Sequence, residues 1–322
     1  MGKRKREVID GTIIINGAHK QLTTNSDTKP LPKKPKLPGK HVSTVASTTI
    51  QIVIGTYERV LHGVTAILPE KLGKGSGEKV EFADTFLFNA HASAIRCLAI
   101  SPPSSAPDVT QPAKVILASG SSDQIINLYH ISTSPPPRQK GKSLSMPSLT
   151  GHKVTENPRN RELGSLQHHS SSVNALQFPT RSKLLSAAED NTIAVTRTRD
   201  WTVLSTIKAP IPKAHGRPSG DTAALGDTPA GVNDFAIHPS MKLMVSVGKG
   251  EKCMRLWNLV TGKKAGVLNF ERDLLQGIGE GRWASGEGRK VEWNSTGKEF
   301  VVGFERGAAI FGMVFHTDHM AC

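Results

Sequence analysis

The sequence predicts an all-β protein built from repeated antiparallel units, and three observations support this. The stretch KVILASGSSDQIINLYHI at Lys114–Ile131 has the pattern of two short apolar strands joined by a polar turn. The same strand–turn–strand unit recurs along the chain, which is typical of repeat architectures. The 322 residues include 30 Gly and 20 Pro and offer no convincing amphipathic helix, which favours many short strands. We expect at most one helical turn, in RDLLQGIGEGRWA.

The unit at Lys114–Ile131 follows the rules of a hairpin. Val115, Leu117 and Ser119 alternate with the period of two that places every second side chain on one face of a strand. Gly120–Gln124 supplies turn residues, and a second apolar strand follows.

Polar residues around this hairpin have a recognisable order. Asp123 stands at the turn, Ser119 ends the first strand, Tyr129 lies in the second, and His91 precedes the unit in NAHASAIRCLAI. Together they resemble the buried hydrogen-bonded tetrad of a WD40 blade. A Ser/His/Asp trio also raises the possibility of a hydrolase, but no G-x-S-x-G motif is present, and the spacing fits a structural network. We therefore expect no catalytic residues and no enzymatic activity.

Four more copies of the unit can be recognised, which gives about five blades. They cover the ranges Ile50–Leu68, Val173–Thr196, Val232–Leu259 and Arg289–Met313. In the second of these, His169, Ser186 and Asp190 take the tetrad positions, and Thr196 replaces the aromatic residue. Trp257 takes the aromatic position in the third.

The repeats define three regions. We expect a disordered basic arm at 1–47, a WD40 β-propeller at 48–315 and a short tail at 316–322. Insertions at 101–113, 133–161 and 209–229 are rich in Pro, Ser, Gly and Lys, so we expect surface loops there. Propellers of this kind commonly have seven blades, so the C-terminal blades are expected to be missing. An unclosed ring would leave an unpaired sheet edge.

Three segments carry a closer resemblance. IVIGTYERVLHG, PAGVNDFAIHPSMKLMVSVGKGEKCMRLWNLVTGKKA and GEGRKVEWNSTGKEFVVGFERGAAIF resemble the nucleolar WD-repeat family of the p21-activated-kinase-interacting protein and its fungal maintenance-of-killer counterpart. The resemblance covers roughly Gln51–Gly312. It implies a non-enzymatic factor in large-subunit (60S) ribosome assembly and rRNA maturation. In animals the family is also linked to restraint of the p21-activated kinase. The long Thr133–Arg161 insertion departs from the family, which also continues with further blades and a basic tail.

The charge distribution is strongly uneven. The formal net charge is +14, and residues 1–40 hold ten basic and three acidic groups, so their net charge is +7. KRKR and KKPK match nuclear-import clusters, and the same charges suit RNA phosphates. Nuclear import, RNA contact and a solubilising tail all remain open for this arm, whose candidate residues are Lys3, Arg4, Lys5, Arg6, Lys33, Lys34 and Lys36.

Other motifs exclude several classes of protein. Cys97, Cys253 and Cys322 are isolated, so neither a disulfide framework nor a zinc site is predicted. We expect no cofactor and no metal. No apolar run is long enough to span a membrane, so no membrane partner is expected.

The resemblance, together with the basic arm, therefore implies a scaffold in the nucleus and nucleolus. Its expected partners are proteins of pre-60S particles, with pre-rRNA contact through the basic arm as an option. The alternative is a regulatory protein that binds a p21-activated-type kinase.

Overall fold

The structure is a computed structural model. It describes residues 48–68, 80–103, 114–133, 146–147, 153–154, 157–211, 230–281 and 284–313. The chain divides into two units, Met1–Thr44 and Val45–Cys322, and every element described below belongs to the second. The expected basic arm at 1–47 lies outside the described residues.

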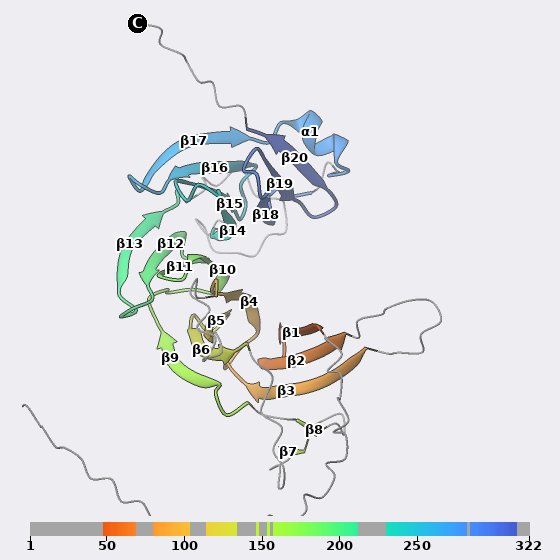
Figure 1. Cartoon of the computed structure of the whole chain (residues 1–322). Helices are drawn as coiled ribbons and strands as arrows, with labels where there is room; N and C mark the ends of the chain where they lie inside the picture. Colours follow the sequence, from red (N-terminus) through yellow and green to blue (C-terminus); the bar gives the residue numbers. More distant parts are fainter. Residues whose placement is uncertain are drawn as a thin grey trace, which may run out of the picture. The chain divides into compact units, whose positions relative to one another are not determined.

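The described part is nearly all-β, as predicted, and contains five antiparallel sheets of three or four strands (Figure 1). The first sheet is β1 (Thr48–Gly55), β2 (Val60–Leu68) and β3 (Glu81–Asn89). The second is β4 (Ile95–Ile100), β5 (Lys114–Ser121), β6 (Ile126–Ser132) and β9 (Arg161–Leu166). The third is β10 (Val173–Thr180), β11 (Lys183–Ala188), β12 (Thr192–Arg197) and β13 (Val203–Lys208).

Two more sheets follow along the chain. The fourth is β14 (Val232–Ile237), β15 (Leu243–Gly248), β16 (Cys253–Asn258) and β17 (Lys263–Asn269). The fifth is β18 (Lys290–Trp293), β19 (Glu299–Gly303) and β20 (Ala308–Gly312). The short strands β7 (Met146–Pro147) and β8 (Lys153–Val154) pair in a separate ladder inside the predicted insertion at 133–161. Five sheets match the five predicted blades.

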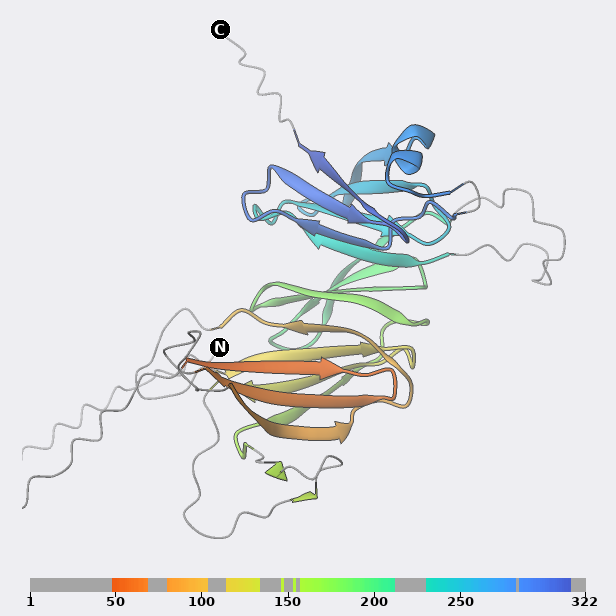
Figure 2. The ribbon, with the colours of Figure 1, turned by 90° about the vertical axis from the view of Figure 1, so that its right-hand side faces the viewer.

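The hairpin turns show how the first sheet corresponds to the others. Arg59, Gln124 and Asn191 each have a positive φ between 60° and 73°. Each of them directly follows the acidic residue of its hairpin turn, which is Glu58, Asp123 or Asp190. The β1–β2 hairpin is therefore equivalent to β5–β6 and β11–β12, and β1 takes the place of a second strand. Within the described residues no strand pairs with the other edge of β1 (Figure 2).

Each sheet packs against the next through one hydrophobic cluster. Leu61 of β2 meets Leu117 of β5 between the first two sheets, and Ile126 joins the cluster between the second and third. Phe235 and Trp257 pack with residues of the third sheet, and Trp293 lies in the cluster between the last two. Central strands are buried on both faces because a sheet covers each side, whereas β13 and β17 are mostly exposed.

Polar side chains also join successive sheets. Asn174 is the extra residue of a β-bulge in β10, and its Nδ2 donates to the Val232 carbonyl of the fourth sheet at 3.0 Å. Asn233 occupies the same place in β14 and donates to the Gly288 carbonyl at 2.9 Å. A bulge re-aims a side chain out of the ladder, which brings both amides to the neighbouring sheet.

The helical turn expected in RDLLQGIGEGRWA is present. Helix α1 spans Arg272–Gly277 and buries Leu275 against the cluster between the last two sheets. Phe270, just before the helix, meets Phe304 edge-on with ring centres 4.9 Å apart. These apolar contacts fix the connection between β17 and β18.

Candidate functional site

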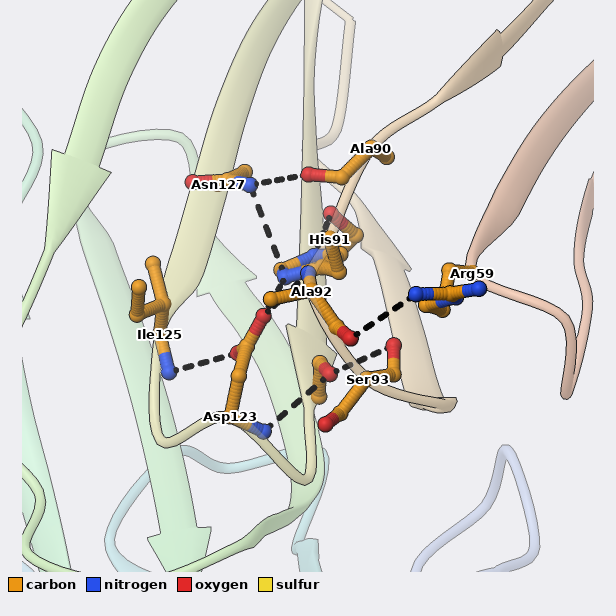
Figure 3. A network of polar contacts seen from close by, with 10 residues as sticks. Arg59, Ala90, His91, Ala92, Ser93, Asp123, Ile125 and Asn127 are labelled. Atoms are coloured by element: carbon orange, nitrogen blue, oxygen red, sulfur yellow. Dashed lines mark hydrogen bonds and ion pairs between the residues drawn. The ribbon is translucent and has the colours of Figure 1, made fainter.

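The first predicted tetrad forms a hydrogen-bonded network at the end of the second sheet (Figure 3). His91 lies in the connection between β3 and β4, Ser119 lies on β5, and Asp123 lies in the β5–β6 turn. His91 Nε2 is 2.8 Å from Ser119 Oγ, and His91 Nδ1 is 3.1 Å from Asp123 Oδ2. The imidazole therefore links an inner strand to a turn.

Backbone groups complete the environment of Asp123. Oδ2 accepts the Ala92 N–H at 3.0 Å, and Oδ1 accepts the Ile125 N–H at 3.0 Å (Figure 3). Burial acts to raise the pKa of Asp123, but these N–H groups and His91 outweigh it and lower the pKa below the ordinary aspartate value. The carboxylate is charged at neutral pH and holds the loop and the turn together.

Two further residues of β6 surround the network. Asn127 donates from Nδ2 to the Ala90 carbonyl at 2.6 Å, which fixes the loop just before His91. The ring of Tyr129 is buried and meets Phe88 edge-on at 5.5 Å between ring centres. Burial and the nearby charge of Glu162 raise the pKa of Tyr129 to about 12.

The third sheet holds an equivalent network. His169 Nε2 is 2.8 Å from Ser186 Oγ, and His169 Nδ1 is 3.0 Å from Asp190 Oδ2. Thr192 donates its backbone N–H and its hydroxyl to Asp190 Oδ1, at 2.9 and 2.6 Å. His168 adds a second imidazole, with Nε2 2.9 Å from Ser186 Oγ.

The fourth sheet keeps the serine without a histidine. Trp257 Nε1 donates to Ser246 Oγ at 2.8 Å. Arg255 and Glu251 form a bidentate ion pair beside the turn. The structure thus brings the predicted Trp257 to a serine that the sequence reading had not singled out.

The buried Ser/His/Asp trios are arranged for structure and not for nucleophilic attack. Ser119 and Ser186 have no exposed surface, and the side chains of His91 and His169 are at most 1% exposed. A nucleophile must reach the atom it attacks, and a substrate cannot reach a hydroxyl beneath the sheet surface. Unpaired polar groups are costly in such a setting, so each network stabilises the fold.

Sequence reasoning missed several members of these networks. Asn127, Thr192 and Ser246 lie within strands and belong to no motif that the sequence shows. A comparison of the hairpins in register with KVILASGSSDQIINLYHI would have found Ser246, since it takes the place of Ser119, two residues after the strand partner of the aromatic residue.

Other predictions fall outside these networks. The candidate import or RNA-contact residues at 3–6 and 33–36 lie outside the described residues. In the described ranges, no group of three or more His, Cys, Asp or Glu side chains could hold a metal ion. No helix in that part of the chain is long and apolar enough to cross a membrane.

Comparisons with known proteins agree with this architecture. The family described as "WD domain, G-beta repeat" matches residues 83–130 and 160–195. These two ranges contain both Ser/His/Asp networks. The chain thus contains WD40 repeats, and its sheets are propeller-like blades, as the sequence predicted.

Several curated proteins resemble most of the chain. Protein MAK11 of Saccharomyces cerevisiae is 28% identical over 276 residues, or 80% of this chain and 52% of the relative. The "p21-activated protein kinase-interacting protein 1-like" of Xenopus laevis is 26% identical over 79% of this chain and 48% of its own length. "Shk1 kinase-binding protein 15" of Schizosaccharomyces pombe is 25% identical over 68% of this chain.

These relatives confirm the resemblance stated from the sequence. The chain is similar to the p21-activated protein kinase-interacting protein 1-like proteins and to MAK11 over about four fifths of its length. It spans about half the length of the first two relatives.

Proposed function

We infer that this chain is a non-catalytic binding scaffold that takes part in assembly and rRNA maturation of the large ribosomal subunit. WD40-repeat proteins are generally non-catalytic scaffolds for protein–protein interaction. The observation that carries the finer proposal is the similarity to MAK11 over 80% of the chain, together with what the family resemblance implies. The net charge of +14 suits a protein that works among RNA phosphates.

A second function is supported by the names of other relatives. Three of them are called kinase-interacting proteins, and one is called a kinase-binding protein. In this function the chain binds a p21-activated-type kinase and restrains it.

Sedimentation of the tagged full chain on a sucrose gradient separates the two functions. The ribosomal proposal predicts that the chain co-migrates with pre-60S particles and leaves those fractions after nuclease treatment of the rRNA. Migration in a small complex that contains the kinase, with none in the pre-60S fractions, supports the second function instead.

The basic arm provides a test of location. We propose that the clusters at Lys3–Arg6 and Lys33–Lys36 direct the chain to the nucleus and nucleolus. Replacing Lys3, Arg4, Lys5, Arg6, Lys33, Lys34 and Lys36 by Ala should move a fluorescently tagged chain to the cytoplasm without changing its thermal melt.

The control removes positive charge from exposed positions outside the arm. Replacing the exposed Lys242, Lys263 and Lys264 by Ala should leave the location unchanged. A nucleolar signal that survives the arm substitutions would mean that another segment or a partner directs import.

A further inference from the structure

The strands of the second and third sheets end in two sets of loops, one at each end of the sheets (Figure 2). One set contains the acidic hairpin turns with Asp123 and Asp190. The opposite end of the same two sheets is rich in exposed cations, which we call the basic end. Its residues are Lys114, Arg159, Arg161, Arg181, Lys183 and Arg199.

Three of these cations meet between the second and third sheets. Arg161 on β9 stands directly opposite His130 on β6, and both lie on the face of the second sheet that looks toward the third. Burial, and then the positive charges of Arg161, Lys114 and Arg181, lower the pKa of His130. Arg181 belongs to the third sheet. Cations from both sheets therefore lie close enough to act on one imidazole.

Lys183 adds an unfavourable pair of like charges. It stands directly opposite Arg197 in the β11–β12 ladder, and like charges at such positions destabilise a sheet. The equivalent positions, counted from the inner serine of each sheet, hold Ile116 opposite His130 in the second sheet and Leu243 opposite Asn258 in the fourth. The fold therefore does not require two cations at this place.

The charges of the basic end are not neutralised within the described residues. None of its six cations forms an ion pair there, and the nearby Asp200 pairs with Arg197, at 2.7 Å between Oδ2 and Nη2. Beside the hairpin turns the cations are paired instead: Lys249 Nζ is 3.5 Å from Glu189 Oε1, and Arg289 Nη2 is 3.2 Å from Glu305 Oε2. The positive charge of the basic end is thus available to a partner.

The arrangement fits a chain of negative charges better than a single anion. Paired strands lie about 4.8 Å apart and packed sheets about 10 Å apart, so cations on several strands of two sheets can meet several phosphates. Protein interfaces have a core that is depleted in charge, whereas interfaces with nucleic acids are much more positively charged. Trp201 at this end packs against the hydrophobic cluster between the two sheets, so we expect contacts with phosphates and not with stacked bases.

We propose that the basic end binds the phosphate backbone of an RNA strand, with little preference for its sequence. Arg161 and Arg181 contact phosphates where the two sheets meet, and Lys183 continues the contact along the third sheet. The proposal deepens the ribosomal function and rests on it for the choice of RNA among polyanions. Binding of purified components tests this surface, whereas the sucrose gradient tests association with the particle, so the two can fail separately.

Fluorescence anisotropy with the purified full chain tests the ligand. The probes are a labelled uridine RNA and a mixed-sequence RNA of about 20 nucleotides each, long enough to cover one binding site, and a labelled polyglutamate peptide of similar length. Because the arm is itself basic, each probe is titrated with the unsubstituted chain and with the chain that carries the seven alanine substitutions in the arm. We expect the two RNAs to bind the arm-substituted chain within about three-fold of each other, and the peptide to bind roughly ten-fold more weakly.

Substitutions at the basic end test the site. Arg161→Ala, Arg181→Ala and Lys183→Ala are combined in the arm-substituted chain. Each phosphate contact on a single strand contributes about 0.7 to the slope of log affinity against log salt concentration, so the slope should fall by about two and the affinity roughly ten-fold. All three side chains are exposed, so the thermal melt should not fall.

The matched control removes the same charge from exposed positions at the opposite end of the fourth and fifth sheets. Lys252→Ala, Arg272→Ala and Arg306→Ala, combined in the same chain, should leave the affinity and the salt slope unchanged. Equal weakening by both triple variants would mean that net charge alone explains the binding, and would overturn the proposal.

Three further results would also overturn it. The first is no binding of either RNA to the arm-substituted chain at about 50 mM salt, where phosphate contacts are strong. The second is an unchanged salt slope in the basic-end variant while its melt matches that of the parent chain. The third is equal affinity for RNA and polyglutamate, which would indicate an acidic protein segment as the partner.

Discussion

The second and third sheets fix their inner serine with histidine, whereas the fourth sheet fixes it with tryptophan. Ser119, Ser186 and Ser246 are each at most 3% exposed, so all three hydroxyls need a partner. His91 and His169 come from the connection before the first strand of their sheet and also reach the aspartate of the turn. Trp257 lies on the third strand and reaches the serine within the hairpin.

Whether a sheet has the histidine or the tryptophan determines which groups hold the chain segment that leads into its first strand. In the histidine-containing sheets, one side chain ties the connection to both a strand and a turn. In the connection before β14 the corresponding contacts are made by Gly231, through its main-chain N–H and carbonyl groups. Its N–H donates to Asn191 Oδ1 at 2.8 Å, and its carbonyl accepts the Lys249 N–H at 2.8 Å. The same fold therefore allows two ways of pairing the buried serine hydroxyl, one through a histidine and one through a tryptophan.

Removing the turn aspartate should have the largest effect. Asp190→Ala and Asp123→Ala each leave backbone N–H groups and an imidazole without their acceptor, so we expect a loss of about 1–3 kcal/mol in the free energy of unfolding. Chemical denaturation of each variant measures this loss. Asp200→Ala, in the exposed turn after β12, is the control and should melt with the unsubstituted chain. Unchanged melts for both buried variants would contradict the role assigned to the networks.

Acid should remove the same contribution without a substitution. The pKa values of Asp123 and Asp190 are lowered in the folded chain, and an unfolded aspartate has a pKa of about 3.9. Their stabilisation is therefore complete well above pH 4 and is lost as the pH falls through the folded values. Urea unfolding at pH 7, 5 and 3 should show the difference between the unsubstituted chain and Asp190→Ala shrinking toward low pH. A difference that stays constant would exclude the charged aspartate as its source.

Removing the hydrogen bond between Trp257 and Ser246 should reduce the free energy of unfolding by less. Trp257→Phe removes the N–H that Ser246 Oγ accepts and leaves a small void, for a loss of about 1–2 kcal/mol. Because neither side chain titrates in acid, this loss should be the same at pH 7 and pH 4. A double-mutant cycle with Ser246→Ala measures the part that belongs to the hydrogen bond. A coupling energy of zero would mean that Trp257 acts through packing alone.

Strands buried on both faces were predictable from the sequence, and the outermost strands were not. The β5–β6 and β11–β12 hairpins combine an apolar period of two with an acidic turn, and each feature supports the other. Strands β13 and β17 lie at a sheet edge with most side chains exposed, so they carry no apolar alternation. Their pairing depends on backbone hydrogen bonds to β12 and β16, which leave no trace in side-chain type.

The networks were predictable only in part, for a related reason. His91, Ser119 and Asp123 follow a fixed order in the repeat, so the sequence brings them together. Asn127 belongs to the first network because its Nδ2 donates to the Ala90 carbonyl, and the residues around Asn127 in the sequence do not indicate that contact. The second histidine of the third sheet is intermediate, since His168 can be seen in the sequence but its contact with Ser186 cannot.

The smallest effect separates the two histidine networks from each other. The second sheet has Ala90 where the third sheet has His168, so the third network alone of the two carries an extra titratable ring. Burial first, and then neighbouring His169, lower the pKa of His168 to about 4, against an opposing effect of Asp190. An unfolded histidine has a pKa of about 6.5, so the unfolded chain binds the additional proton between these two values. Stability from His168 is therefore full above pH 6.5 and falls as the pH drops toward 4.

His168→Gln keeps a polar side chain that does not titrate, and it should reduce the loss of unfolding free energy between pH 7 and pH 4.5. Ala90→Gln in the second sheet is the matched control and should leave the pH dependence unchanged. Identical pH profiles for the unsubstituted chain and His168→Gln would show that His168 stays accessible to protons in the folded chain, and that the two networks respond to acid through their aspartates alone.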